Sequence, residues 1–188
     1  MVNIDAKGKP CPMPVILAKK EMEKGQPFSI TVDNETAVGN LTRLAGAKGC
    51  TLNVINGEGE YTLEFSAPSG EVSESTEGGA YAVFFNKNTV GSGDDTLGGN
   101  LAKMMLYTLT QSDSIPSYVL LMNGGVRLAC EQETADHLNA LIDKGCTVMV
   151  CGTCLNFFGI AEEIKAGIVS NMYDILTAMQ QVSKVITV

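Results

Sequence analysis

Apolar residues in the first 66 positions change their spacing several times. Alternation, which is typical of a half-buried strand, is found at 2–6 and 28–32, and on both sides of an Asn-Gly-Glu-Gly turn, at 52–55 and 61–65. Helical spacing is found at 15–22 and 38–48, and each stretch is followed by a glycine, Gly25 or Gly49. The order βαβαββ predicts two helices on one face of a four-stranded sheet, a two-layer α/β sandwich.

From residue 80 onward the pattern becomes more regular. Short apolar runs that are typical of buried strands occupy 81–85, 118–122, 146–151 and 185–188, with a further short one at Val169. Helical stretches at 95–109, 131–144, 160–166 and 172–182 separate them. Repeated strand–helix units predict a doubly wound, mainly parallel sheet.

Residues 67–79 separate the two patterns. They read APSGEVSESTEGG, which contains almost nothing that a core would bury. We therefore expect a first domain over residues 1–66, a linker over 67–79 and a second domain over 80–188.

Charge and composition exclude several classes of function. The chain has 188 residues, of which 45% are hydrophobic and 18% charged, and 21 acidic residues against 13 basic ones give a net charge of −8. This excess of acid argues against nucleic-acid and anionic membrane partners, which favour basic surfaces. The first ten residues are too polar for a secretory signal, and no apolar run is long enough to span a bilayer. We expect a cytoplasmic protein whose six cysteines are thiols, ligands or redox groups.

Cys11 is the first candidate for chemistry, because it stands between prolines in the run Pro10-Cys11-Pro12-Met13-Pro14. Pro12 suits the first position of a helix, which would place Cys11 at or near the N-cap. There the helix dipole, with Lys9 nearby, favours the thiolate, and a pKa lowered from ~8.5 to ~6.5 would make the thiolate the main form at neutral pH. The alternative is a cysteine that only occupies a turn.

Cys151 and Cys154 form a Cys-x-x-Cys pair that follows an apolar strand. The carboxyl ends of strands are where open parallel sheets place their chemistry. One thiol of such a pair can attack while the other resolves a mixed disulfide. Two alternatives are a zinc site, for which only Cys130, Cys146 and His137 remain as further ligands, and two small residues packed at a strand end. We expect no metal at this pair.

The remaining candidates carry weaker signals. Cys50 and Cys146 fit small, semi-buried residues, whereas Cys130 follows a strand end and could lie near Cys151. The glycine-rich loop at 91–99 lacks the residues that phosphate-binding motifs need, so we expect it to cap the next helix and we expect no cofactor. His137 falls off the apolar stripe of its helix and fits a solvated position.

The first domain resembles a known family. Cys11-Pro12-Met13-Pro14, placed between the first strand and the first helix of a βαβαββ order, is similar to the TusA (SirA-like) sulfur carriers. This resemblance covers residues 1–66. It implies that Cys11 carries a persulfide and hands its sulfur on, with Pro12 and Pro14 as the motif's helix-starting prolines.

The second domain resembles the DsrE-like sulfurtransferases, through the strand ending at Cys151 and the sequence CGTCLNFFGI that begins there. The resemblance implies that Cys151 relays persulfide sulfur; Cys154 has no counterpart in the general pattern, so its resolving role rests on spacing alone. The combination of the two domains is similar to the YedF-type proteins, which are associated with selenium metabolism.

These observations lead to one main hypothesis and two alternatives. The main one is a sulfur or selenium relay, in which a cysteine desulfurase-like persulfide donor loads Cys11 and the cargo passes to Cys151 or to an acceptor protein. The resemblance also implies a homo-oligomer formed through the second domain. The alternatives are a dithiol oxidoreductase that uses Cys151 and Cys154, and a scaffold that binds a sulfur or selenium enzyme without carrying the atom.

Overall fold

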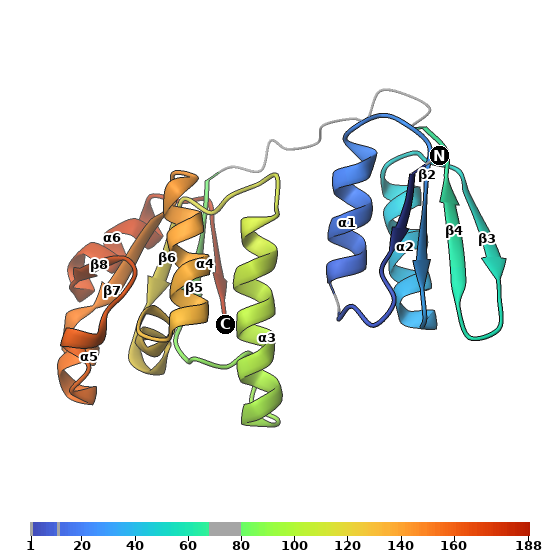
Figure 1. The fold of residues 1–188 in the computed structure, drawn as a ribbon. Coiled ribbons are helices and arrows are strands. Elements are labelled where there is room, and N and C mark those ends of the chain that lie inside the picture. Colours follow the sequence, from blue (N-terminus) through green and yellow to red (C-terminus); the bar gives the residue numbers. More distant parts are fainter. Residues whose placement is uncertain (1, 11, 68–79) are drawn as a thin grey trace. The chain divides into compact units, whose positions relative to one another are not determined.

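A computed structural model describes residues 2–10, 12–67 and 80–188 of the chain (Figure 1). The chain divides into two compact units, Met1–Glu74 and Ser75–Val188. Except for Ala67, the linker expected at 67–79 lies outside the described residues. Each unit has its own buried core, and the two are described separately below.

The first unit is a mixed four-stranded sheet with two helices. Its elements are β1 (Val2–Asp5), α1 (Met13–Met22), β2 (Phe28–Val32), α2 (Glu35–Ala47), β3 (Leu52–Asn56) and β4 (Tyr61–Phe65). The strand order is β1-β2-β4-β3, with β1 parallel to β2 and the other pairs antiparallel. Both helices cover the same face of the sheet (Figure 1). The predicted βαβαββ sandwich is confirmed.

Alternation along β2 explains how this sheet acquires one apolar face. Phe28 and Ile30 lie in the core that the helices cover, and the ring of Phe28 stacks on that of Phe65 with centroids 4.7 Å apart. The neighbouring positions of β2 point to the other face, where the hydroxyls of Thr31 and Thr62 are hydrogen bonded at 3.2 Å. The sheet therefore holds its helices on one side and polar cross-strand pairs on the other.

The second unit is a five-stranded sheet in which every strand pair is parallel. Its strands are β5 (Tyr81–Phe85), β6 (Tyr118–Leu121), β7 (Thr147–Cys151), β8 (Ile168–Ser170) and β9 (Lys184–Thr187). Its helices are α3 (Asp95–Thr110), α4 (Gln132–Asp143), α5 (Gly152–Phe158) and α6 (Met172–Gln180), with the short 3₁₀ helices η1 (Asn123–Ala129) and η2 (Ala161–Glu163).

The strand order β8-β7-β6-β5-β9 brings the last strand back to the far edge of the sheet. α3 and α4 lie side by side on one face of the sheet and α6 on the other, as a doubly wound sheet requires (Figure 1). The predicted fold class is confirmed. Because all strands run the same way, their carboxyl ends lie at one edge of the sheet, where β7 ends at Cys151.

One helix of the second unit was predicted in the wrong place. The sequence pattern indicated a helix over 160–166, whereas α5 begins directly after Cys151 and ends at Gly159, whose φ of 68° is left-handed. Only the three-residue η2 follows. The spacing of apolar residues suggested a helix there because Ile160 and Ile164 pack against the core, but they do so from an irregular segment. In α5 itself, Leu155 is the one fully buried side chain.

Large apolar side chains are exposed along one stretch of the second unit. Edge strand β8 and the first turns of α6 expose Ile168, Val169, Met172, Tyr173 and Leu176 by 49–78%. Among the described residues, no helix is both long and apolar enough to cross a membrane. An exposed apolar stretch of this kind beside an unpaired strand edge is typical of a surface that contacts another protein.

Candidate thiol sites

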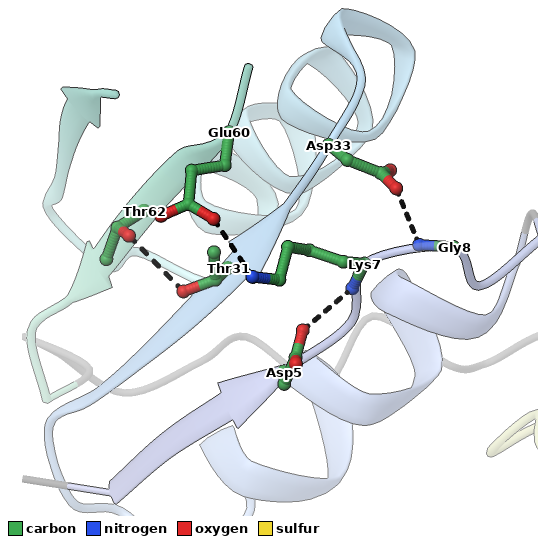
Figure 2. Close-up of polar contacts among 7 residues, drawn as sticks. All are labelled: Asp5, Lys7, Gly8, Thr31, Asp33, Glu60 and Thr62. Atoms are coloured by element: carbon green, nitrogen blue, oxygen red, sulfur yellow. Dashed lines mark hydrogen bonds and ion pairs between the residues drawn. The ribbon is translucent and has the colours of Figure 1, made fainter. Parts of the chain in front are cut away.

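The loop between β1 and α1 is held by contacts to the ends of β2 and β4 (Figure 2). The backbone N–H of Gly8 donates to Asp33 Oδ2 at 2.7 Å, and Lys7 Nζ forms an ion pair with Glu60 Oε2 at 2.9 Å. Asp5 Oδ1 accepts a hydrogen bond from the Lys7 N–H at 3.1 Å. Lys7 and Gly8 are thus fixed just before the sequence Lys9-Pro10-Cys11.

Two of these groups have shifted pKa values. The Gly8 N–H, followed by the Asn34 side chain, lowers the pKa of Asp33 below its ordinary value. The hydrogen bond to Glu60, and then its charge, raises the pKa of Lys7. Both groups are therefore held in their charged forms, in which their contacts to the loop and to β4 are strongest.

Two prolines define the start of α1. Pro12 occupies the N-cap and Pro14 the second helical position, and the Ile16 N–H donates the first helical bond to the Pro12 carbonyl at 3.2 Å. The helix thus begins one residue later than predicted, because the Met13 N–H is used in a turn to the Pro10 carbonyl at 2.9 Å. Cys11, the predicted carrier thiol, lies outside the described residues.

A small pocket of about 30 Å³ lies beside this helix start. Pro12 and Pro14 form one side of it, Lys9 adds an ammonium group, and residues at the start of α2, including Asn34, form the other side. The volume admits one or two water-sized groups and no organic substrate. Any cargo handled beside these prolines therefore has to be very small or has to be presented by another molecule.

In the second unit the structure brings Cys151 and Cys154 together. Cys151 ends β7 and is the N-cap of α5, and Cys154 is the third residue of that helix. The Cys151 side chain is buried, with 3% of its surface exposed, whereas Cys154 is only half-buried. Both are free thiols. The Cys-x-x-Cys spacing therefore produces one accessible and one shielded thiol.

Cys154 has a backbone partner that the sequence did not reveal. The N–H of Asn123, directly after β6, donates a hydrogen bond to Cys154 Sγ at 3.1 Å. Asn123 has φ 48° and is the only non-glycine residue in the described ranges with a positive φ, a conformation that asparagine tolerates better than most residues. Asn-Gly-Gly after an apolar strand was the available signal, since such residues favour unusual backbone turns.

The pKa of Cys154 is raised overall, although the contributions to it differ in sign. Burial raises this pKa most, and a hydrogen bond with the Cys151 side chain raises it further. The Asn123 N–H opposes both by stabilising negative charge on the sulfur. Negative charge on Cys151 would raise the pKa of Cys154 further.

Two contacts hold η1, which carries Asn123, against the end of the sheet and against α5. A Cβ at Gly125 would lie 2.2 Å from the Phe85 carbonyl oxygen, so only glycine permits this approach of η1 to β5. At its other end, the Arg127 guanidinium lies 4.5 Å from the centroid of the Phe158 ring in α5. These contacts fix the position of the Asn123 amide relative to the thiol that it meets.

The thiols of the other described cysteines, Cys50, Cys130 and Cys146, face backbone carbonyls. Cys130 is half-buried, its Sγ faces the carbonyls of Val126 and Ile160 at 3.6 and 3.9 Å, and burial raises its pKa. Burial also raises the pKa of Cys50, and that of Cys146 to about 11. Cys50 and Cys146 are buried, somewhat more fully than the semi-buried positions predicted for them.

A pocket in the second unit lies away from the thiol pair. It has a volume of about 550 Å³ and lies at the amino end of β7, where Cys146, Asn139 and Ile142 are among its lining residues. Neither Cys151 nor Cys154 lines it. The thiol pair is at the carboxyl end of the same strand, which separates the two features by the length of β7.

The remaining sequence candidates have structural roles. Asp94, in the glycine-rich loop, caps α3 by accepting a hydrogen bond from the Leu97 N–H at 2.8 Å, as predicted. The ring of His137 is half-buried and packs against that of Tyr107, with centroids 5.5 Å apart, so it is less solvated than expected. Within the described ranges, no group of three or more His, Cys, Asp or Glu side chains could hold a metal ion.

Comparisons with known families agree with this architecture. Residues 81–188 match the family model described as DsrE/DsrF-like. The chain belongs to the DsrE/DsrF-like family. Residues 2–66 match the family model described as Sulfurtransferase TusA, so a TusA-like domain precedes the DsrE-like domain. Both are families of the sulfur-relay or sulfurtransferase type. A comparison with curated proteins found no match.

Two solved structures are similar to one domain each. The SirA-like protein from Desulfitobacterium hafniense is 31% identical, with a TM-score of 0.35; the match covers 37% of this chain and all of that one. The ychN protein from E. coli is 15% identical, with a TM-score of 0.46; the match covers 58% of this chain and 99% of that one.

Proposed function

We propose that this protein carries sulfur, or selenium, as a cysteine-bound persulfide-type cargo, and that it relays this cargo between Cys11 and the thiol pair Cys151–Cys154. The observation that carries the proposal is the contact between a shielded and an accessible thiol at the carboxyl edge of the DsrE-like sheet. A TusA-like domain with a Cys-Pro-Met-Pro sequence on the same chain supplies the second thiol that a relay requires.

Cys11 is the proposed carrier because of what surrounds it in the sequence. It directly precedes Pro12, which caps α1, and it follows a loop that contacts to Asp33 and Glu60 hold in place. A helix start favours the thiolate, which is the form that attacks a persulfide. The small pocket beside Pro12 and Pro14 fits a cargo of one atom better than it fits an organic substrate.

The proposed partners follow from this chemistry. TusA-like sulfur carriers work with sulfur donors and acceptors, so a cysteine desulfurase-like donor would load Cys11 and an acceptor protein would take the cargo. Selenium is proposed beside sulfur because selenolates and thiolates undergo the same exchange. Further copies of this chain are also proposed partners, through the exposed apolar residues of β8 and α6.

Loading with a small persulfide tests the carrier. The double variant Cys151→Ser/Cys154→Ser, incubated with glutathione persulfide, should gain the mass of one sulfur atom, and peptide mapping should place it on Cys11. Adding Cys11→Ser should abolish the gain. Adding Cys50→Ser instead, a buried thiol of the same domain, should leave it intact. Absence of sulfur from Cys11 under these conditions contradicts the proposed carrier role.

A dithiol oxidoreductase is the second candidate, and the contact between Cys151 and Cys154 favours it. This function predicts a reversible loss of two hydrogens confined to that pair, with Cys11 taking no part. A scaffold that binds a sulfur or selenium enzyme predicts neither adduct nor disulfide. Mass measurement on the unsubstituted chain, beside the double variant, therefore separates the three functions, because only the carrier gains sulfur on Cys11 and only the oxidoreductase forms the disulfide without any persulfide.

A further inference from the structure

The arrangement of the thiol pair points to a reaction beyond carriage. We propose that Cys151 and Cys154 release the cargo as hydrosulfide: sulfur enters at Cys154, and Cys151 expels it by forming a disulfide with Cys154. This inference rests on the proposed function, because it needs a persulfide to reach the DsrE-like domain. It gives Cys154 a role that neither its family nor its spacing assigned.

Accessibility decides which thiol receives the sulfur. Cys154 is half-buried and lies on the first turn of α5, next to the exposed Asn123, whereas the Cys151 side chain is only 3% exposed. An incoming persulfide has to bring its outer sulfur into line with the attacking thiolate. Only Cys154 offers that approach without a rearrangement of the end of β7.

The first step transfers one sulfur atom to Cys154. Its thiolate attacks the outer sulfur of the donor persulfide, a new S–S bond forms on Cys154, and the donor's S–S bond breaks. The bonding electrons leave with the donor, which departs as a thiolate, and no net oxidation occurs. The Asn123 N–H, 3.1 Å from Cys154 Sγ, stabilises the negative sulfur from which the attack starts.

The second step releases the sulfur. The Cys151 thiolate attacks the inner sulfur of the Cys154 persulfide, a Cys151–Cys154 disulfide forms, and the bond to the outer sulfur breaks. The outer sulfur leaves with the bonding electrons as hydrosulfide. Two cysteine sulfurs are oxidised by two electrons in total, and the released sulfur is reduced by two. A dithiol reductant, as a chemical class, is needed only to restore both thiols for another cycle.

Burial gives Cys151 the properties of a resolving thiol. Its position at the N-cap of α5, three residues before Cys154, keeps its side chain in hydrogen-bonding contact with the Cys154 thiol. Residues three apart at a helix start have Cβ atoms about 5–6 Å apart, a separation that a disulfide can close with a small adjustment. Shielding from solvent limits its reaction with outside persulfides and leaves Cys154 as its nearest target.

A single-turnover experiment tests this assignment on the full chain. Cys11→Ser, which isolates the second thiol site, is mixed with glutathione persulfide without any reductant, and sulfide and protein mass are measured against a protein-free blank. We expect one sulfide per chain and a chain that has lost two hydrogens. Adding Cys151→Ser should abolish sulfide release and leave one extra sulfur on Cys154, whereas adding Cys154→Ser should abolish both release and loading.

Cys130→Ser is the matched control, because Cys130 is also half-buried but faces backbone carbonyls. Combined with Cys11→Ser, it should release sulfide as before. Undiminished release after Cys154→Ser, or a persulfide that accumulates on Cys151 in that variant, overturns the assignment. If the Cys11→Ser chain takes up no sulfur while the chain with Cys11 does, this inference fails and the carrier function stands.

Discussion

Asn123 connects two features that are far apart in the sequence: the turn after β6 and the accessible thiol of α5. Its backbone N–H meets Cys154 Sγ only because its φ is 48°, and the glycines that follow bring η1 against the end of β5. A left-handed conformation costs a non-glycine residue roughly 1–2 kcal/mol, so the packing of η1 has to stabilise it.

Gly125 is the residue at which this packing is most sensitive. Gly125→Ala would place a Cβ 2.2 Å from the Phe85 carbonyl oxygen, so η1 would have to move away from β5. We expect the DsrE-like domain to lose about 2–3 kcal/mol of unfolding free energy, as over-packed cores do, and sulfide release to slow. Urea unfolding, followed by signals that arise from the DsrE-like domain, measures the change in unfolding free energy.

The neighbouring glycine provides the control for this prediction. A Cβ at Gly124 would meet its nearest atom at 3.6 Å, which is an ordinary contact. Gly124→Ala should therefore change the unfolding free energy by much less than Gly125→Ala. Equal destabilisation by the two variants would show that the approach of Gly125 to Phe85 is not what positions η1.

At the scale of the elements, three contacts position the segments next to the candidate thiols. In the TusA-like domain, Asp33 and Glu60 hold the loop that leads to α1. In the DsrE-like domain, the contact between Arg127 and Phe158 joins η1 to α5. Each contact can be removed without touching a cysteine, so each gives a test of positioning that is separate from the chemistry.

Asp33 should make the loop before α1 sensitive to acid. Because the pKa of Asp33 is lowered in the folded chain, its contribution is present at neutral pH and is lost only as the pH falls through that lowered value. Relative to its intrinsic rate, hydrogen exchange at the Gly8 amide should therefore accelerate at acidic pH, and in Asp33→Ala it should already be fast at neutral pH.

The Ala6 amide provides an internal reference for this measurement. It donates to the Thr31 backbone carbonyl at 2.8 Å and has no titrating partner in that bond. The exchange rate of the Ala6 amide, corrected for the intrinsic pH dependence, should not change with the protonation of Asp33. If Gly8 keeps its protection in Asp33→Ala, the carboxylate does not hold the loop.

Arg127→Ala should slow sulfide release while leaving all thiols in place. Loss of the guanidinium from the Phe158 ring frees α5 from η1, and the Asn123 N–H then meets Cys154 less often. The stability cost should be about 0.5–1 kcal/mol, the usual size of an exposed cation–π contact. Single-turnover sulfide release, measured beside urea unfolding, separates the effect on the reaction from the loss of stability.

Lys184→Ala is the matched variant for Arg127→Ala. Lys184 lies 5.5 Å from the Tyr81 ring centroid on the far edge of the sheet. It should show a comparable small stability loss and an unchanged rate of release. A parallel fall in release for both variants would attribute the effect to general loosening of the domain.

The sequence allowed both fold classes to be predicted, because alternation and helical spacing report which faces are buried. It also identified Cys151 and Cys154 as a pair, since strand ends in parallel sheets meet at one edge. It placed the helix after Cys151 wrongly, because Ile160 is buried and Ile164 packs against the core without either being in an α-helix. Asn123 could not be found from spacing, since its contribution is a backbone amide whose direction depends on tertiary packing.

At the scale of the whole molecule, the exposed residues of β8 and α6 predict self-association. Val169 and Tyr173 are 60% and 78% exposed, and burying them on another copy would remove apolar area from water. Val169→Glu/Tyr173→Glu should shift sedimentation equilibrium to smaller species. Ile55→Glu, at a 47% exposed apolar residue of the TusA-like domain, should not. A wild-type chain that sediments as a monomer would contradict this prediction.

The relay itself is the central claim, and it is a property of the complete chain. The most direct test is a time course with a cysteine desulfurase as donor and isotopically labelled cysteine as the sulfur source, in which persulfides are trapped by alkylation and mapped by peptide mass. We predict label on Cys11 first, then on Cys154, with labelled sulfide released last; in Cys151→Ser the label should stop at Cys154. Label that reaches the DsrE-like domain equally fast in Cys11→Ser, or that never appears on Cys11, would contradict the account.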